Sequence, residues 1–198
     1  MDAEIKIKAL PIDSQRCRFT VDRPVIEHRA VYFPSVGKAR GSPLAEALFA
    51  IAGVSAVLVS HDTVTVTRTG FDEWPDTARQ VGAAIRAQLQ SGVAPISEAA
   101  LATMPGEDEI RARVEQLLET QINPAVGSHG GWVELLGVQG NNVFLQLGGG
   151  CQGCGMADVT LKQGIEPRLR EEIPELGEVL DQTDHAAGRN PYYAQSKK

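Results

Sequence analysis

A segment in the middle of the chain, residues 93–106, constrains the possible folds most. It reads Val-Ala-Pro-Ile-Ser-Glu-Ala-Ala-Leu-Ala-Thr-Met-Pro-Gly and has no clear helical or strand period. Such a mixture is typical of a linker, which can contain a short helical turn. We therefore expect two domains, at residues 1–92 and 107–183, a linker at 93–106 and a flexible tail at 184–198.

The first half combines strand and helix patterns. In Arg16–Val21 and in residues 63–67, apolar side chains alternate with polar ones, which is the pattern of a half-buried strand. Ser42 and Pro43 suit a helix start, and Pro75 opens a second helix with one apolar face. Further strands are expected at Ala30–Phe33 and at residues 54–59.

The second half repeats this mixture. Acidic residues at 107–109 suit the N-terminus of an amphipathic helix. Asn123-Pro124 should end that helix, because the residue before a proline avoids the helical conformation. A hairpin at 132–138 and 143–147, a helix from about Cys154 and a last strand at 177–183 should follow. We expect an α+β fold: two small α/β sandwich domains, each with a mixed or antiparallel sheet and helices on one face.

Composition excludes several classes of protein. The formal net charge is −6 and the pI is near 5.3, whereas partners such as nucleic acids or anionic membranes favour clustered Lys and Arg. No apolar run approaches the roughly 20 residues of a membrane helix, and the first residues do not resemble a signal peptide. We therefore expect a cytoplasmic protein with no nucleic-acid or membrane partner. Its 3 cysteines favour metal or redox chemistry over disulfides.

The chemistry centres on Gly148-Gly-Gly-Cys151-Gln-Gly-Cys154-Gly, predicted at a turn from strand to helix. Two residues between the sulfurs let both point at one ion or cluster. A helix N-terminus lowers the pKa of a thiol and so favours the thiolate that binds metal. The glycines leave the sulfurs unshielded and let the backbone approach a bulky inorganic core. Cys151 and Cys154 are therefore the candidate ligands of an iron–sulfur cluster.

Three other interpretations of the pair remain open. A thioredoxin-like dithiol would also lie at a helix start, but the triple glycine and the lack of a neighbouring aromatic fit it poorly. Structural zinc needs four ligands, and the pair plus His129 or His185 shows no recognisable spacing. An incidental pair in a glycine-rich turn would be liable to oxidation.

The number of ligands predicts a shared site. Iron–sulfur clusters usually take four thiolates, and this loop offers two. Cys17 lies on the apolar face of a predicted strand, so we expect a small buried hydrophobic residue there and not a ligand. Two chains related by a two-fold axis would supply four thiolates. A cluster held between chains on exposed loops should be labile, which suits a carrier better than an enzyme.

The second half closely resembles the C-terminal domain of NifU, which the Nfu iron–sulfur carriers share. The resemblance lies in five motifs in order: Asn123-Pro-Ala-Val, His129-Gly-Gly-Trp-Val, Gly149-Gly-Cys-Gln-Gly-Cys, Asp158-Val-Thr-Leu-Lys-Gln-Gly-Ile-Glu and Ile173-Pro-Glu. Met156-Ala-Asp-Val-Thr and the tail from Asp184 to Tyr193 resemble the bacterial carriers of the NfuA type.

The first half resembles the Nfu N-terminal domain in Gly41-Ser-Pro-Leu-Ala-Glu-Ala-Leu-Phe-Ala-Ile-Ala-Gly-Val, in Thr63-Val-Thr-Val-Thr and in Trp74. It departs from the family at Ile12-Asp-Ser-Gln-Arg-Cys, where an Asn-Pro-Asn-rich segment is common. This domain has no cysteine pair, so the resemblance implies client recognition or stability as its role.

The resemblance implies that the protein is a scaffold or carrier and not an enzyme. It would receive a [4Fe–4S] cluster from an upstream assembly scaffold, hold it on Cys151 and Cys154 of a homodimer, and deliver it to apo-proteins. The alternative is a thiol–disulfide oxidoreductase that uses the same two cysteines. Beside the loop, His129 is expected to be a turn residue, and Trp132 is expected to pack in the core and not to serve as a docking aromatic.

Overall fold

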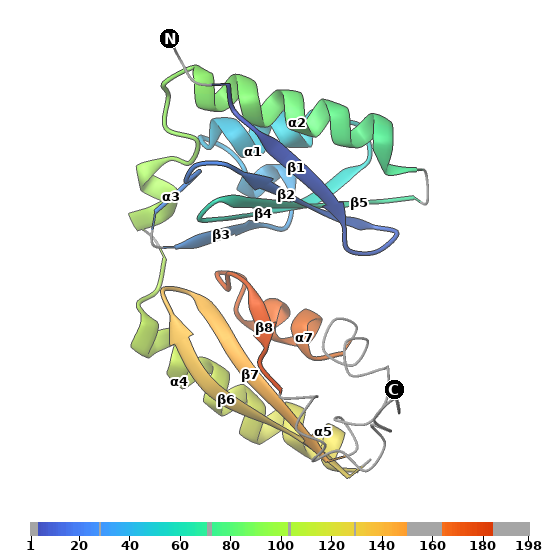
Figure 1. The fold of residues 1–198 in the computed structure, drawn as a ribbon. Coiled ribbons are helices and arrows are strands. Elements are labelled where there is room, and N and C mark those ends of the chain that lie inside the picture. Colours follow the sequence, from blue (N-terminus) through green and yellow to red (C-terminus); the bar gives the residue numbers. More distant parts are fainter. Residues whose placement is uncertain are drawn as a thin grey trace. The chain divides into compact units, whose positions relative to one another are not determined.

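The computed structural model describes residues 4–27, 29–70, 73–102, 104–128, 130–149 and 164–183. The chain divides into two compact units, Met1–Met104 and Pro105–Lys198. Each unit contains one sheet together with helices (Figure 1). The expected α+β class with two small domains is confirmed.

The first unit is built on a five-stranded sheet in the order β1-β2-β5-β4-β3, and every neighbouring pair is antiparallel. Its strands are β1 (Ile7–Pro11), β2 (Arg16–Val21), β3 (Ala30–Phe33), β4 (Val54–Ser60) and β5 (Thr63–Arg68). Its helices are the 3-10 turn η1 (Val36–Lys38), α1 (Pro43–Phe49), α2 (Trp74–Gln90) and α3 (Glu98–Ala102).

Alternation along the strands creates the core of the first unit. Phe19 of β2 pairs with Val64 of β5, and Val64 pairs with Val59 of β4; all three side chains are fully buried. Helices α1 and α2 lie on this face of the sheet (Figure 1) and add Leu48 and Ile85 to the same core. The two helices therefore bury the apolar side of the strands, as the period-two pattern predicts.

Strand β1 is the element of this sheet that the sequence patterns missed. It pairs with β2 from Ile7 opposite Val21 to Pro11 opposite Cys17. The strand lies at the edge of the sheet, and four of its five residues are exposed. An edge strand with so little burial shows only weak alternation of apolar and polar residues. Its last residue is a proline, which has no N–H to donate to the neighbouring strand.

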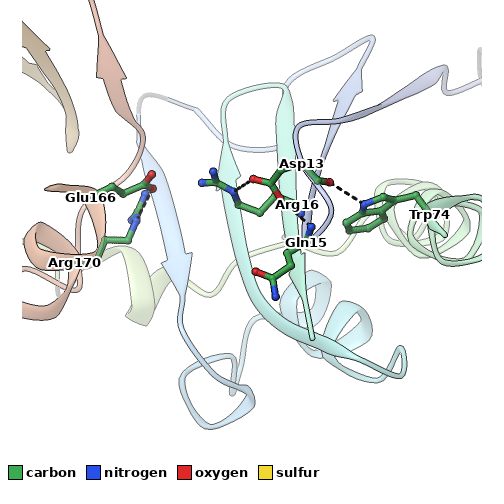
Figure 2. A network of polar contacts seen from close by, with 6 residues as sticks. All are labelled: Asp13, Gln15, Arg16, Trp74, Glu166 and Arg170. Carbon is green, nitrogen blue, oxygen red and sulfur yellow. Dashed lines mark hydrogen bonds and ion pairs between the residues drawn. The ribbon is translucent and has the colours of Figure 1, made fainter. Parts of the chain in front are cut away.

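The turn between β1 and β2 is organised by Asp13. Its carboxylate accepts hydrogen bonds from the backbone N–H groups of Gln15 and Arg16, at 2.9 and 2.8 Å, and pairs with the Arg16 side chain (Figure 2). Partial burial raises the pKa of Asp13, but these bonds outweigh it and hold the pKa below its ordinary value. Trp74 at the start of α2 donates from Nε1 to the Asp13 carbonyl at 3.3 Å (Figure 2) and fixes the turn to the helix.

Part of the segment expected to be a linker packs on the first unit. Ile96 is buried in its core. The Leu44 N–H donates to the Pro95 carbonyl at 3.0 Å, and the Ser97 N–H donates to Ser42 Oγ at 3.3 Å. Residues 95–97 therefore hold the start of α1, and α3 follows them directly.

The second unit contains a three-stranded sheet in the order β6-β7-β8. The sheet is mixed, since β6 and β7 are antiparallel and β7 and β8 are parallel. Its elements are α4 (Glu107–Leu117), the π-helical turn η2 (Leu118–Ile122), α5 (Asn123–Gly127), β6 (Gly131–Gln139), β7 (Asn142–Gly149), α7 (Glu166–Glu172) and β8 (Val179–Asp181). Ile110, Leu117, Leu145 and Leu169 belong to one core.

The expected end of the first helix of this unit at Asn123-Pro124 was wrong. The helix passes through η2 into α5, and Pro124 lies in the first turn of α5. A wider π turn removes the need for a regular i to i−4 hydrogen bond at the proline, so the chain stays helical. Within the described ranges, no helix is both long and apolar enough to cross a membrane.

Candidate functional site

The predicted ligands Cys151 and Cys154 lie outside the described residues, as does His129. The structure describes the two points where their loop is attached: Gly149 at the end of β7 and Gly164 before α7. The base of this loop is the end of the hairpin formed by β6 and β7.

The register of the hairpin brings two conspicuous motifs together. Gly131 pairs with Gly149, Trp132 pairs with Gly148, and Val133 pairs with Leu147. The Gly-Gly-Trp motif at the start of β6 thus lies beside the triple glycine that precedes Cys151. This placement follows from two features of the hairpin: the turn at Gly140, where φ is +63°, and a bulge between Leu135 and Gly137 that shifts the register of β6 by one residue.

Gly148 is needed because an indole occupies the place of a side chain. A Cβ atom at Gly148 would lie 1.8 Å from Cε2 of Trp132. The ring therefore lies directly against the backbone of β7. The expectation that Trp132 packs in the core was wrong, since its side chain is 42% exposed, while Val133 and Leu147, next in the register, are buried in the core.

Gly149 is needed for a different reason. Its φ is +63°, a region that other residues rarely adopt, and a Cβ there would lie 2.0 Å from the carbonyl oxygen of Gly130. Gly149 is therefore required for its backbone conformation. At Gly148, in contrast, the missing side chain makes room for Trp132.

Asn123 fixes the outer edge of the hairpin base. Its side-chain amide donates to the carbonyl of Val133 at 2.9 Å, and its Oδ1 accepts the N–H of Val133 at 2.7 Å. The amide thus binds β6 as a neighbouring strand would and satisfies two groups of an edge strand. The sequence analysis treated Asn123 only as a helix end. The signal it offered was a side chain that can both donate and accept hydrogen bonds, placed next to an expected helix boundary.

Thr183 fixes the other side of the base. Its Oγ1 accepts the N–H of Leu147 at 2.8 Å in a buried position and donates to the carboxylate of Asp181. The Gln182 N–H also donates to the Leu145 carbonyl at 2.9 Å. The last residues of β7 are therefore held from both sides. No sequence pattern singled out Thr183, because the bond joins residues 36 positions apart.

Covalent geometry places the candidate ligands near this base. Cys151 is three residues beyond Gly148, so their Cα atoms are at most ~11 Å apart. The same bound holds between Cys151 and Cys154. Across the described part of the chain, no group of three or more His, Cys, Asp or Glu side chains could hold a metal ion.

Cys17 is a buried residue of the first core, as expected. It is fully buried on β2, opposite Val66. Burial raises the pKa of the Cys17 thiol, although a backbone hydrogen bond with Leu10 and the charge of Arg68 act in the opposite direction. The thiol is therefore protonated at neutral pH and lacks the access that a ligand needs.

Comparisons with known proteins match both units. A family profile described as "Scaffold protein Nfu/NifU N terminal" matches residues 5–92, and one described as "NifU-like domain" matches residues 114–180. A protein named "Fe/S biogenesis protein NfuA" from Pseudomonas savastanoi pv. phaseolicola is 53% identical over 91 residues, which are 44% of this chain and 46% of that protein. Its namesake from Pseudomonas aeruginosa PAO1 is 52% identical over 92 residues, which are 46% and 47% of the two chains. The chain thus spans about half the length of these relatives.

Two solved structures are similar at low identity. The solution NMR structure of a NifU-like protein from Saccharomyces cerevisiae has a TM-score of 0.42 and 19% identity, and the match covers 48% of this chain and 86% of that one. The crystal structure of protein SAV1430 from Staphylococcus aureus has a TM-score of 0.34 and 14% identity, with 41% and 98% covered.

Proposed function

Because the chain carries both domains of the Nfu/NifU family and so belongs to it, we propose that it is an iron–sulfur cluster carrier that binds its cargo through Cys151 and Cys154. One observation carries the proposal: a Cys-x-x-Cys pair with glycines on both sides lies within the matched NifU-like segment, residues 114–180. Thiolates at this spacing are the usual protein ligands of iron–sulfur clusters.

The number of thiolates supports a cluster shared between two chains. A [4Fe–4S] cluster takes about four thiolates, and one chain supplies two from this loop. Cys17 does not complete the set, because it is fully buried in the core of the other unit. A homodimer with one cluster between two identical loops therefore satisfies the cluster with the ligands that the chain has.

Transfer to apo-proteins follows from the same arrangement. When the dimer opens, the two thiolates of one chain leave the cluster, and thiolates of the apo-protein take these positions and then displace the two that remain. The partners we propose are an upstream assembly scaffold and apo iron–sulfur proteins. Two ligand thiols stay reduced only in a reducing compartment, so we assign the function to the cytoplasm.

Anaerobic reconstitution with iron and sulfide tests the proposal. Wild type should become brown and dimeric, with about four irons per two chains. The Cys154→Ala variant should bind no cluster, because each chain then offers a single thiolate. Its apo form should melt at the wild-type temperature, since the substitution removes a loop sulfur and leaves the buried core unchanged. Cys17→Ala is the matched control and should load as wild type does.

Transfer is tested separately with the apo form of a [4Fe–4S] protein, by recovery of that protein's activity after mixing. A loaded dimer that restores this activity supports delivery, and one that keeps its cluster opposes it. A colourless monomer that reduces a test disulfide through Cys151 and Cys154 would overturn the carrier in favour of an oxidoreductase.

A further inference from the structure

We propose that Trp132 is a positioning residue for the loop of Cys151 and Cys154. Its indole holds the end of β7 at Gly148 and so fixes where the loop leaves the sheet. This inference rests on the proposed function and deepens it, because it names a residue outside the cysteine pair on which retention of the cluster depends.

The position of the ring is the first argument. Trp132 faces Gly148 in the register, and a Cβ on Gly148 would lie 1.8, 2.1 and 2.3 Å from three indole atoms. The ring therefore occupies the volume that any other residue at position 148 would fill. Such close packing restricts the end of β7 to one position relative to the ring.

The second argument is that core packing does not account for the ring. Trp132 is 42% exposed, and its neighbour in sequence, Val133, points into the core instead. A half-exposed indole contributes only part of the free energy that full burial would give. Leu136, on the same strand, is also exposed, at 46%, but it lies at the bulge and has no partner in the register, so it provides a comparison in which an exposed apolar side chain of β6 faces no residue of β7.

The third argument is that the strand carrying Trp132 is itself held. The Asn123 amide binds both backbone groups of Val133, at 2.7 and 2.9 Å. On the other side of Trp132, the Gly130 carbonyl oxygen lies so close to Gly149 that a Cβ there would be only 2.0 Å away. The backbone of β6 is therefore held on both sides of Trp132, and the ring in turn holds Gly148 in place. A binding site on a loop requires such rigid support.

Chain length links this contact to the cysteines. Two residues separate Gly148 from Cys151, so the Cα atom of the first ligand lies within ~11 Å of the Gly148 Cα atom. A shared cluster uses the same loop from each of two chains, so greater mobility at the end of β7 would affect the cysteine pair of both chains. We therefore expect loss of the ring to weaken retention of the cluster more than it weakens the fold.

The first experiment compares Trp132→Ala and Trp132→Phe with Leu136→Ala in the full-length protein. The readouts are the rate at which an iron chelator bleaches the cluster absorbance and the melting temperature of the apo form. Trp132→Ala should lose its cluster at least several-fold faster than wild type, Trp132→Phe should recover much of the difference, and Leu136→Ala should match wild type. The apo melting temperatures should all lie within ~5 °C of one another. Equal bleaching rates for Trp132→Ala and wild type would overturn the inference.

The second experiment needs no cluster, so it separates this inference from the proposed function. It measures the rates at which the thiols of Cys151 and Cys154 are alkylated in the apo protein. Trp132→Ala and Gly148→Ala should each raise these rates, the latter because its new methyl displaces the ring. In the double variant Trp132→Ala/Gly148→Ala, the second substitution should not raise the alkylation rates further, because the indole atoms that the new Cβ would meet are absent. Gly137→Ala, with no atom within 4 Å of the new Cβ, is the control and should react as wild type does.

The outcomes of the two experiments are distinct. If wild type binds no cluster but the alkylation rates are coupled as expected, the proposed function fails and the positioning role of Trp132 stands. If wild type binds a cluster and the effects of Trp132→Ala and Gly148→Ala simply add, or neither changes the rates, the carrier stands and the positioning role fails.

Discussion

At the scale of single residues, Cys17 is the cysteine whose environment the structure describes. Cys17 is fully buried, and burial raises the pKa of its thiol. Because the thiolate is the reactive form, we expect Ellman's reagent to titrate two thiols per native chain within minutes and a third only after unfolding. The Cys17→Ala variant should still show two fast thiols. A third fast thiol in the native wild type would place Cys17 within reach of solvent and contradict its placement in the core.

The same scale shows why the candidate site could be predicted only in part. The cysteine pair is a local signal, so its spacing alone singles out Cys151 and Cys154, which stay a prediction. The role of Gly148 depends on Trp132, which is 16 residues away and meets it only through the hairpin register. A pattern read along the chain shows that Gly148 is small but does not identify the ring that requires it.

At the scale of elements, the attachment of β8 to β7 depends on a side chain. Strand β8 has only three residues, and Thr183 beyond its end accepts the buried N–H of Leu147 at 2.8 Å. Thr183→Val keeps the shape and removes the acceptor, which leaves a buried donor unpaired. We expect it to lower the free energy of unfolding of the second unit by about 1–3 kcal/mol. Urea unfolding followed by far-ultraviolet circular dichroism measures the change.

Thr183→Ser is the matched control for this prediction. It keeps the hydroxyl that accepts from Leu147 and donates to Asp181, and it loses only a methyl group. Its loss of stability should therefore be smaller than that of Thr183→Val. Equal destabilisation of the two variants would mean that the hydrogen bond contributes no more to stability than the methyl group does, which contradicts the prediction.

Strands β2 and β5, whose burial alternates strongly, could be predicted from their sequence pattern. Residues of β2 and β5 alternate between the core and the other face, and the expected bounds Arg16–Val21 agree with the structure. Strand β1 was missed because only Ile7 of its five residues is even partly buried. Asn123-Pro124 was misjudged because a local rule for proline cannot anticipate a π turn, which depends on how the whole helix packs on β6.

At the scale of the whole molecule, the buried apolar residues that the structure describes form two clusters, one in each unit. The first contains Phe19, Leu48 and Ile85, and the second contains Leu145 and Leu169. The candidate ligands Cys151 and Cys154 belong to the sequence of the second unit alone. A unit with its own core can unfold as a cooperative whole, so stability and cargo binding should be separable by mutation.

The pair Leu48→Ala and Leu145→Ala tests this separation. Both side chains are fully buried, so each substitution should lower the stability of its own unit by about 2–5 kcal/mol. Calorimetry should show a lowered transition for one unit in each variant. Iron content after reconstitution, measured a few degrees below the wild-type transitions, should stay at the wild-type level in Leu48→Ala and fall in Leu145→Ala. Equal losses of iron in the two variants would mean that cluster binding depends on the first unit as much as on the second, because the ligands themselves are the same in both proteins.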